Sequence, residues 1–185
     1  MDLDRIILFC HVVAMIGLFA NLAIESVGLR FLRRATSYEQ SREWIKLWSL
    51  LVPFGVPSAL VSLASGIYLA ITLGAWNLDW VKVAVPTLVI VALAGGIVGP
   101  RRNRLQAAIA RNDGPLSYDL LVQIRHPLLR ASLWFRAALL AGLVFDMTAR
   151  PDSSVLVIVT MAFIGILCSL SAWRRGPAKS IESSS

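Results

Sequence analysis

Charged side chains are scarce in this sequence. Only 16% of its 185 residues are Asp, Glu, Lys or Arg, whereas 57% are hydrophobic. A soluble domain of this length would carry about 25% charged residues and about 45–50% apolar ones. The deficit argues against a soluble domain with one core and a solvated surface. It favours a chain that is largely surrounded by lipid.

Cysteine and histidine are equally scarce, with two of each. Cys10 and Cys168 lie near opposite ends of the first and last apolar segments, so a disulfide between them is excluded and we expect two small buried thiols. A copper site would need several soft ligands, and we predict no metal site. No nucleophile stands beside a base among the few polar residues, which argues against a hydrolase.

Five apolar segments account for most of the sequence. Each is close to the ~20 residues that a helix needs to cross a bilayer. They cover residues 6–29, 50–73, 81–98, 131–149 and 155–173. We therefore predict an all-α protein, a polytopic transmembrane bundle of five spans within residues 1–176. Residues 177–185 form a polar tail that we expect to be disordered.

The net charge of +7 is unevenly distributed along the chain. Fifteen of the eighteen basic residues follow the first or fifth span, lie between the third and fourth, or lie just inside the fourth; the exceptions are Arg5, Lys82 and Arg150. This placement predicts an N-terminus outside and a C-terminus in the cytoplasm. The basic loops would then face anionic lipid headgroups, so membrane lipid is the expected partner and nucleic acid is not.

The first basic connection, RFLRRATSYEQSREWIK, is expected to be helical in its second half. A capping box can begin at Thr36 or, one residue later, at Ser37, and the sequence does not choose between them. Trp44 and Trp48 are placed like interfacial anchors at the start of the second span. In the second basic connection, Ser117 can cap a short helix that ends before Pro127.

Small residues recur at spacings of four in two spans. Such seams let helix backbones approach closely. The second span carries one seam and the third a shorter one: Ser58, Ser62, Gly66 and Ala70, then Gly95 and Gly99. We expect both to pack inside the bundle, and contact between copies in a homo-oligomer is the alternative.

Polar residues within the first span form one stripe of its helix. The stripe contains small and polar side chains that should face the bundle rather than lipid: His11, Ala14, Leu18, Asn21, Glu25 and Gly28. His11 and Glu25 are about 21 Å apart along the axis, so they belong to two separate clusters.

The outer cluster combines His11 with Lys82 and Asp146, which lie at similar depths on three spans. A neutral imidazole there could ligate a haem iron or another metal. Lys82 could hold a propionate or other acid, and Asp146 could orient His11 or neutralise Lys82. In the alternative interpretation, Lys82 and Asp146 reach water and His11 bonds to a neighbouring carbonyl.

The inner cluster pairs Glu25 with Arg136, with Asn21 nearby. Unpaired charges at that depth cost several kcal/mol, and a mutual salt bridge relieves both. The pair can be structural, or it can gate a proton or ion path.

Three stretches resemble a known family. FCHVVAMIGLFANLAIESVGLRFLRR resembles the first helix of a predicted bacterial integral-membrane family of unknown function, related to the copper-resistance protein D and HemJ-type protoporphyrinogen oxidase group. WNLDWVKVAVP resembles its tryptophan-lysine opening of helix three, and LLRASLWFRAALLAGLVFDMTARPD its penultimate or last helix. The similarity covers roughly residues 5–152 and implies a bacterial inner-membrane location.

By this resemblance, His11 and Lys82 match the histidine and lysine that HemJ-type proteins place around haem and substrate. The tryptophan-glycine-glycine that follows the first histidine in that group is replaced here by GLFAN. Two functional classes are therefore expected. The first is a membrane protein that binds haem or another small ligand through His11, and the second is a cofactor-free small transporter or scaffold with a buried Glu25–Arg136 pair.

Overall fold

The computed structural model describes residues 2–51, 54–149 and 153–174. The predicted tail and Arg150 lie outside these residues. All regular secondary structure in the described part is helical. The elements are α1 (Leu3–Leu32), α2 (Tyr38–Leu51), α3 (Gly55–Thr72), the short 3₁₀ helix η2 (Ala75–Asn77), α4 (Asp79–Arg111), α5 (Tyr118–Arg125), α6 (Pro127–Ala149) and α7 (Ser154–Arg174).

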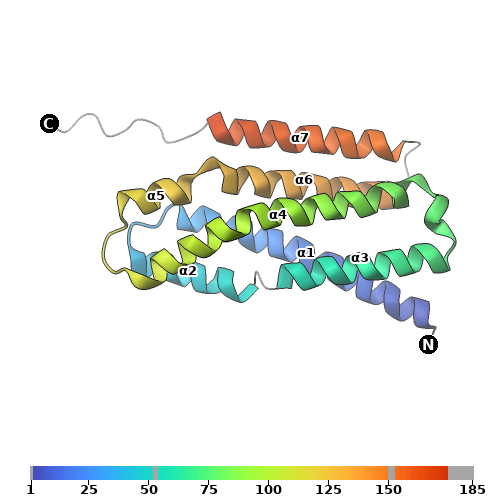
Figure 1. Cartoon of the computed structure of the whole chain (residues 1–185), viewed down its shortest axis with the longest axis horizontal. Helices are drawn as coiled ribbons and strands as arrows, with labels where there is room; N and C mark the ends of the chain where they lie inside the picture. Colours follow the sequence, from blue (N-terminus) through green and yellow to red (C-terminus); the bar gives the residue numbers. More distant parts are fainter. Residues whose placement is uncertain (1, 52–53, 150–152, 175–185) are drawn as a thin grey trace.

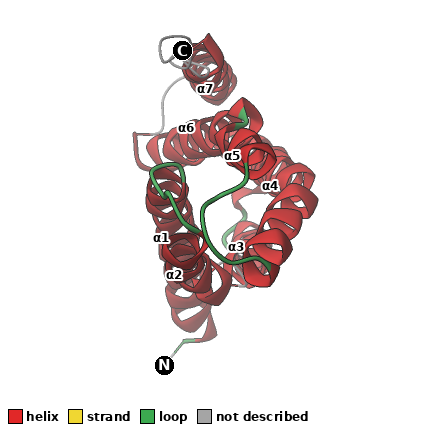
Figure 2. Cartoon of the chain, turned by 90° about the vertical axis from the view of Figure 1, so that its left-hand side faces the viewer, coloured by secondary structure: helices red, strands yellow, loops and turns green. Residues whose placement is uncertain are grey.

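Five helical segments are long and apolar enough to cross a membrane: α1, α3, α4, α6 together with the preceding α5, and α7. They run along one common axis, with α2 and α5 gathered at one end (Figure 1). The prediction of an all-α bundle with five membrane-length helices is therefore confirmed. Figure 2 shows α7 on the outside of the bundle, where it packs mainly on α6.

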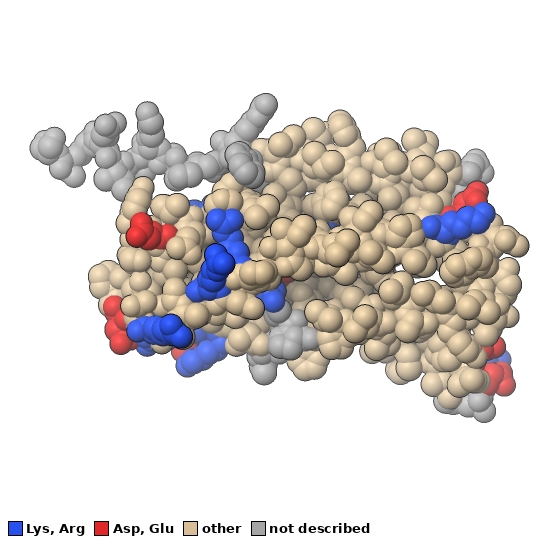
Figure 3. All heavy atoms as spheres, viewed as in Figure 1, with Lys and Arg blue, Asp and Glu red and all other residues tan. Residues whose placement is uncertain are grey.

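The outward-facing surface of these helices is predominantly apolar. Between 11% and 39% of the residues in the five apolar windows are buried, so most of them face outwards. On the face drawn in Figure 3, charged side chains gather towards the two ends and leave a broad uncharged band between them. A soluble monomer rarely exposes so large an apolar surface. The surface is that of a multi-pass membrane protein.

Two of the expected boundaries differ from the observed ones. Residues 50–51 end α2, although the apolar pattern assigns them to the second span, and α3 begins only at Gly55. Pro57 lies in the first turn of α3, where its missing N–H removes no helical hydrogen bond. The helix of the third span extends beyond the expected residues 81–98 and continues without a break to Arg111.

The prediction that Trp48 is an interfacial anchor is wrong. It lies on α2 with only 1% of its surface exposed, within a core built by α1, α2, α4, α5 and the start of α6. Trp44 is partly buried and stacks on Phe31 of α1, with ring centroids 4.0 Å apart. Both rings thus attach α2 to the bundle, because α2 folds back along α1 instead of continuing into α3.

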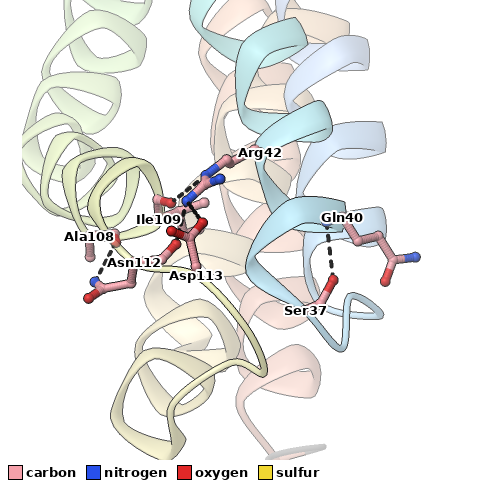
Figure 4. Close-up of polar contacts among 7 residues, drawn as sticks. All are labelled: Ser37, Gln40, Arg42, Ala108, Ile109, Asn112 and Asp113. Atoms are coloured by element: carbon pink, nitrogen blue, oxygen red, sulfur yellow. Dashed lines mark hydrogen bonds and ion pairs between the residues drawn. The ribbon is translucent and has the colours of Figure 1, made fainter.

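We call the end of the bundle that carries α2 and α5 the basic end. Its two connections pair with each other, because the Tyr38 amide donates to the Gly114 carbonyl at 2.9 Å. Arg42 extends this contact by donating to the Ile109 carbonyl at 3.2 Å and by forming an ion pair with Asp113 at 2.5 Å (Figure 4). The carbonyls in the last turn of a helix such as α4 carry partial negative charge, and a cation such as Arg42 stabilises them.

The caps of the short helices agree with the sequence signals. The Ser37 hydroxyl accepts a hydrogen bond from the Gln40 amide at 3.3 Å, so the later of the two capping registers is the one used (Figure 4). Ser117 caps α5 by accepting from the Leu120 amide at 3.4 Å. The short helix ends at Arg125, and Pro127 opens α6.

Candidate functional site

His11 lies on the face of α1 that packs against α3, and its ring is half-buried. Its Nδ1 is 2.9 Å from the Ser62 carbonyl and 3.0 Å from the Ser65 hydroxyl. A carbonyl can only accept, so Nδ1 donates and Nε2 keeps its lone pair. Gly66 makes room for the ring, because a Cβ there would come within 3.1 Å of Cε1.

A cavity of about 430 Å³ adjoins this imidazole. Its walls come from α1, α3, the start of α4 and the end of α6, and they are almost entirely apolar. Its lining includes Met15, Ser62, Gly66 and Met147 besides His11. Among these described lining residues, His11 alone carries a group that titrates near neutrality. We call this space the histidine cavity.

Lys82 does not reach the histidine cavity. Val81 and Ala84 are the buried residues of the first turns of α4, so the intervening Lys82 is turned away from the bundle by the helical phase. Its Nζ lies 3.3 Å from Asp79 Oδ1, and the two side chains are 56% and 75% exposed. In the described structure, Lys82 therefore pairs with Asp79 at the surface and does not approach His11 as expected.

Asp146 is fully buried, yet neither of its carboxylate oxygens has a hydrogen-bond partner among the described residues. It does not contact His11 through a hydrogen bond. Leu143 and Met147 are the α6 residues that line the histidine cavity. Among the described residues, no hydrogen bond or ion pair joins Asp146 to His11 or Lys82.

The inner pair does form. Arg136 Nη2 donates to Glu25 Oε1 at 2.7 Å, and the two side chains are 9% and 5% exposed. Arg136 Nε also donates to the Ser132 carbonyl at 3.3 Å. Gly95 leaves space for the guanidinium, because a Cβ there would lie 3.4 Å from Nη1. Whether this pair is structural or gates a path stays a prediction.

The small-residue seams pack within the chain. Ser58 faces Gly17 of α1, where a Cβ would come within 2.5 Å of its hydroxyl oxygen. Ser62 donates to the Met15 sulfur at 3.0 Å, and Gly66 lies against His11. Ala70, the last residue of this seam, is buried. Gly99 of the shorter seam has no atom within 4 Å of an added Cβ, and contact between copies there stays a prediction.

Arg102 is a site residue that the sequence did not single out among the arginines after the third span. It lies on the extended part of α4, with its guanidinium carbon 5.9 Å from the centre of the Trp48 ring. It lines one cavity together with Arg136. The sequence does contain a signal that could have identified Arg102. It lies seven residues after Gly95, so the two residues share one face if the helix is continuous.

A second cavity, of about 450 Å³, lies beside these charges. Arg102, Arg136 and Asn21 all line it, so Asn21 shares a cavity with the ion pair. Asn21 also packs against the start of α3, where a Cβ on Gly55 would come within 2.8 Å of Nδ2. We call this space the arginine cavity.

The described residues contain no group of three His, Cys, Asp or Glu side chains placed to hold a metal ion. Cys10 and Cys168 are free, and Cys10 is exposed on the surface of α1, which corrects the expectation of two buried thiols. Comparison with protein-family models, with curated proteins and with solved structures finds no match to this chain. The interpretation of both cavities therefore depends on their geometry.

Proposed function

We propose that this chain is a multi-pass protein of a bacterial inner membrane, with its N-terminus outside, that binds a small apolar ligand in the histidine cavity. The supporting observation is the hydrogen bond from His11 Nδ1 to the Ser62 carbonyl at 2.9 Å. This bond orients the ring and leaves the Nε2 lone pair for a ligand. The apolar wall favours a molecule with little charge, and Nε2 favours one that carries a hydrogen-bond donor.

Haem is the cofactor that the family resemblance implies, and the donor set does not fit it well. His11 is suitable as an axial ligand. The cavity supplies no cation for the propionates, because Lys82 lies outside its lining and pairs with Asp79. A smaller apolar ligand without acidic groups agrees better with the residues present.

The test is to identify what co-purifies with the protein. Detergent-purified wild type, His11→Ala and His126→Ala are extracted with organic solvent and compared by mass spectrometry. His126 is the matched control, because it lies at the junction of α5 and α6, away from the histidine cavity. We expect a compound that the His11 variant loses at least about tenfold and the His126 variant retains.

A Soret absorbance that His11→Ala abolishes would instead restore the haem interpretation. Equal recovery of every co-purifying compound from all three proteins would contradict a ligand site at His11. Both outcomes are measured on the same preparations.

The buried Glu25–Arg136 pair favours a second candidate, a cofactor-free transporter or membrane scaffold. A gating role requires that the pair can be broken while the bundle stays folded. Substitution of Glu25 that leaves the protein folded but changes ion or proton flux in proteoliposomes would support a gate. Loss of folding would support a structural pair.

A further inference from the structure

Arg102 carries a buried donor that no described residue satisfies. Its Nε is buried and has no hydrogen-bond partner among the described residues. Its guanidinium carbon lies 5.9 Å from the centre of the Trp48 ring, a contact that provides no acceptor. Removing an N–H donor from water without an acceptor is costly. An acceptor supplied from outside the chain would remove that cost.

Arg136 contributes a second available donor to the same cavity. It uses Nε on the Ser132 carbonyl and Nη2 on Glu25, whereas Nη1 has no partner among the described residues. The side chain is 9% exposed and lines the arginine cavity beside Gly95. A buried guanidinium that lines a cavity can donate a charge-assisted hydrogen bond to an oxyanion there.

The charges of this cluster do not balance. Arg102 and Arg136 carry two positive charges and Glu25 one negative charge, which leaves one positive charge. The surroundings are largely apolar, where an uncompensated charge is expensive. One anionic group bound between the arginines would neutralise it.

The rest of the cavity indicates what the anionic group is attached to. Asn103, Gln106 and Ser49 line its polar part near Arg102. Towards the membrane interior it continues into a groove of about 540 Å³ between α3 and α4. The two spaces share their lining at Ala59, Leu60, Ala92 and Gly96. The described lining of the groove is apolar throughout, which suits an acyl chain.

We propose that the arginine cavity binds the phosphate of an anionic membrane lipid, with Arg102 and Arg136 as donors and an acyl chain in the groove between α3 and α4. Arg102 lies on the extension of α4 towards the basic end, where headgroups would lie, and basic pockets between membrane helices bind such headgroups. The shared chemistry is a phosphate oxyanion, which a soluble phosphate could also supply. The continuous apolar groove favours the lipid. This site is separate from the histidine cavity.

The experiment measures thermal unfolding of delipidated protein in detergent with added phosphatidylglycerol, phosphatidylcholine or inorganic phosphate. A ligand that binds the native state raises the midpoint with its concentration. The variants are Arg102→Gln and Arg104→Gln. Arg104 is the matched control, because it lies on the same helix, is exposed, and loses the same charge.

We expect phosphatidylglycerol to raise the midpoint by about 5 °C in wild type and in Arg104→Gln, and by less than about 1 °C in Arg102→Gln. Phosphatidylcholine should act more weakly because its headgroup has no net charge. An equal effect of inorganic phosphate would identify a soluble anion as the ligand and overturn the lipid assignment.

Gly99→Leu provides a second variant that keeps both arginines. Gly99 lines the arginine cavity, and no atom lies within 4 Å of an added Cβ, so the side chain can fill the space without a clash at its base. Leucine also favours helix more than glycine does. We expect this variant to fold and to lose the phosphatidylglycerol effect. An undiminished effect in both Gly99→Leu and Arg102→Gln, or no effect in wild type, would refute the site.

Discussion

The ion pair between Glu25 and Arg136 joins α1 to α6 at a depth where neither charge is tolerated alone. Their contact at 2.7 Å leaves Glu25 Oε2 buried and without a hydrogen-bond partner among the described residues. A buried pair is often no more stable than apolar residues of similar size, whereas half of a pair is strongly destabilising. The two side chains should therefore behave as one unit.

Substituting one partner should cost more than substituting both. We expect Glu25→Leu to lower the free energy of unfolding by about 3–5 kcal/mol, because it leaves Arg136 buried without its carboxylate. In Glu25→Leu/Arg136→Leu, at least about 2 kcal/mol of this loss should be recovered. Unfolding in detergent by temperature, followed by circular dichroism, measures both. Strictly additive losses would mean that the two side chains do not interact.

Side-chain direction explains why some site residues were predictable and others were not. Glu25 and Arg136 each lie deep in an apolar segment, so the sequence alone shows that they need partners. Lys82 lies near the end of its span, where a side chain can turn to water, and it pairs with Asp79. Arg102 did not stand out from the other arginines after the third span, because only the tertiary structure places it on one cavity with Arg136.

The packing of α7 on α6 depends on glycine. A Cβ on Gly142 would lie 2.7 Å from Met161 Cγ, and one on Gly165 would lie 3.2 Å from Phe135 Cα. Ser169 strengthens the interface by donating to the Ala131 carbonyl at 2.8 Å. Sequence reasoning did not select this interface, although small residues four apart, such as Ala138 and Gly142, carry the same signal as the two seams.

Gly142→Ala and Gly96→Ala form a matched comparison within this bundle. Alanine is favoured over glycine in a helix by about 1 kcal/mol, and nothing lies within 4 Å of an added Cβ at Gly96. We expect Gly96→Ala to be neutral or stabilising. Gly142→Ala should destabilise by about 1–3 kcal/mol because Met161 must move. Equal unfolding midpoints for the two variants would show that α7 is not closely packed.

The cap of α5 was also predictable, and that of α2 to within one residue, because a cap depends on residues three positions apart. The start of α3 was not. The hydropathy of residues 50–51 suits a membrane span, whereas the structure places them at the end of α2, which the buried Trp48 attaches to the core. Hydropathy reports how apolar a segment is, and not which apolar surface covers it.

The whole bundle has an asymmetric charge distribution. Arg33, Arg125 and Arg130 gather at the basic end, and burial together with the charges of Arg130 and Arg125 lowers the pKa of Arg33. Positive charge is retained on the cytoplasmic side during insertion. The first helix begins and the last one ends at opposite ends of the bundle, as five crossings require (Figure 1).

Reporter fusions test the proposed orientation. Alkaline phosphatase fused after residue 76 should be active, because the link between α3 and α4 would lie outside. The same reporter fused after residue 113 should give near-background activity, because that connection lies at the basic end. A fluorescent protein at the C-terminus should be bright, since it would stay in the cytoplasm. The reversed pattern would contradict an external N-terminus.

Local composition was enough to predict five membrane-length helices, their basic connections, the caps of α2 and α5, and the need of Glu25 for a partner. These properties depend on residues within one or two helical turns, and lipid imposes them on each segment separately. The two cavities, the separation of Lys82 from His11 and the position of Arg102 on one cavity with Arg136 were decided by tertiary structure. Each depends on how helices distant in sequence rotate and cross, because a change of one position along a helix turns a side chain by about 100°.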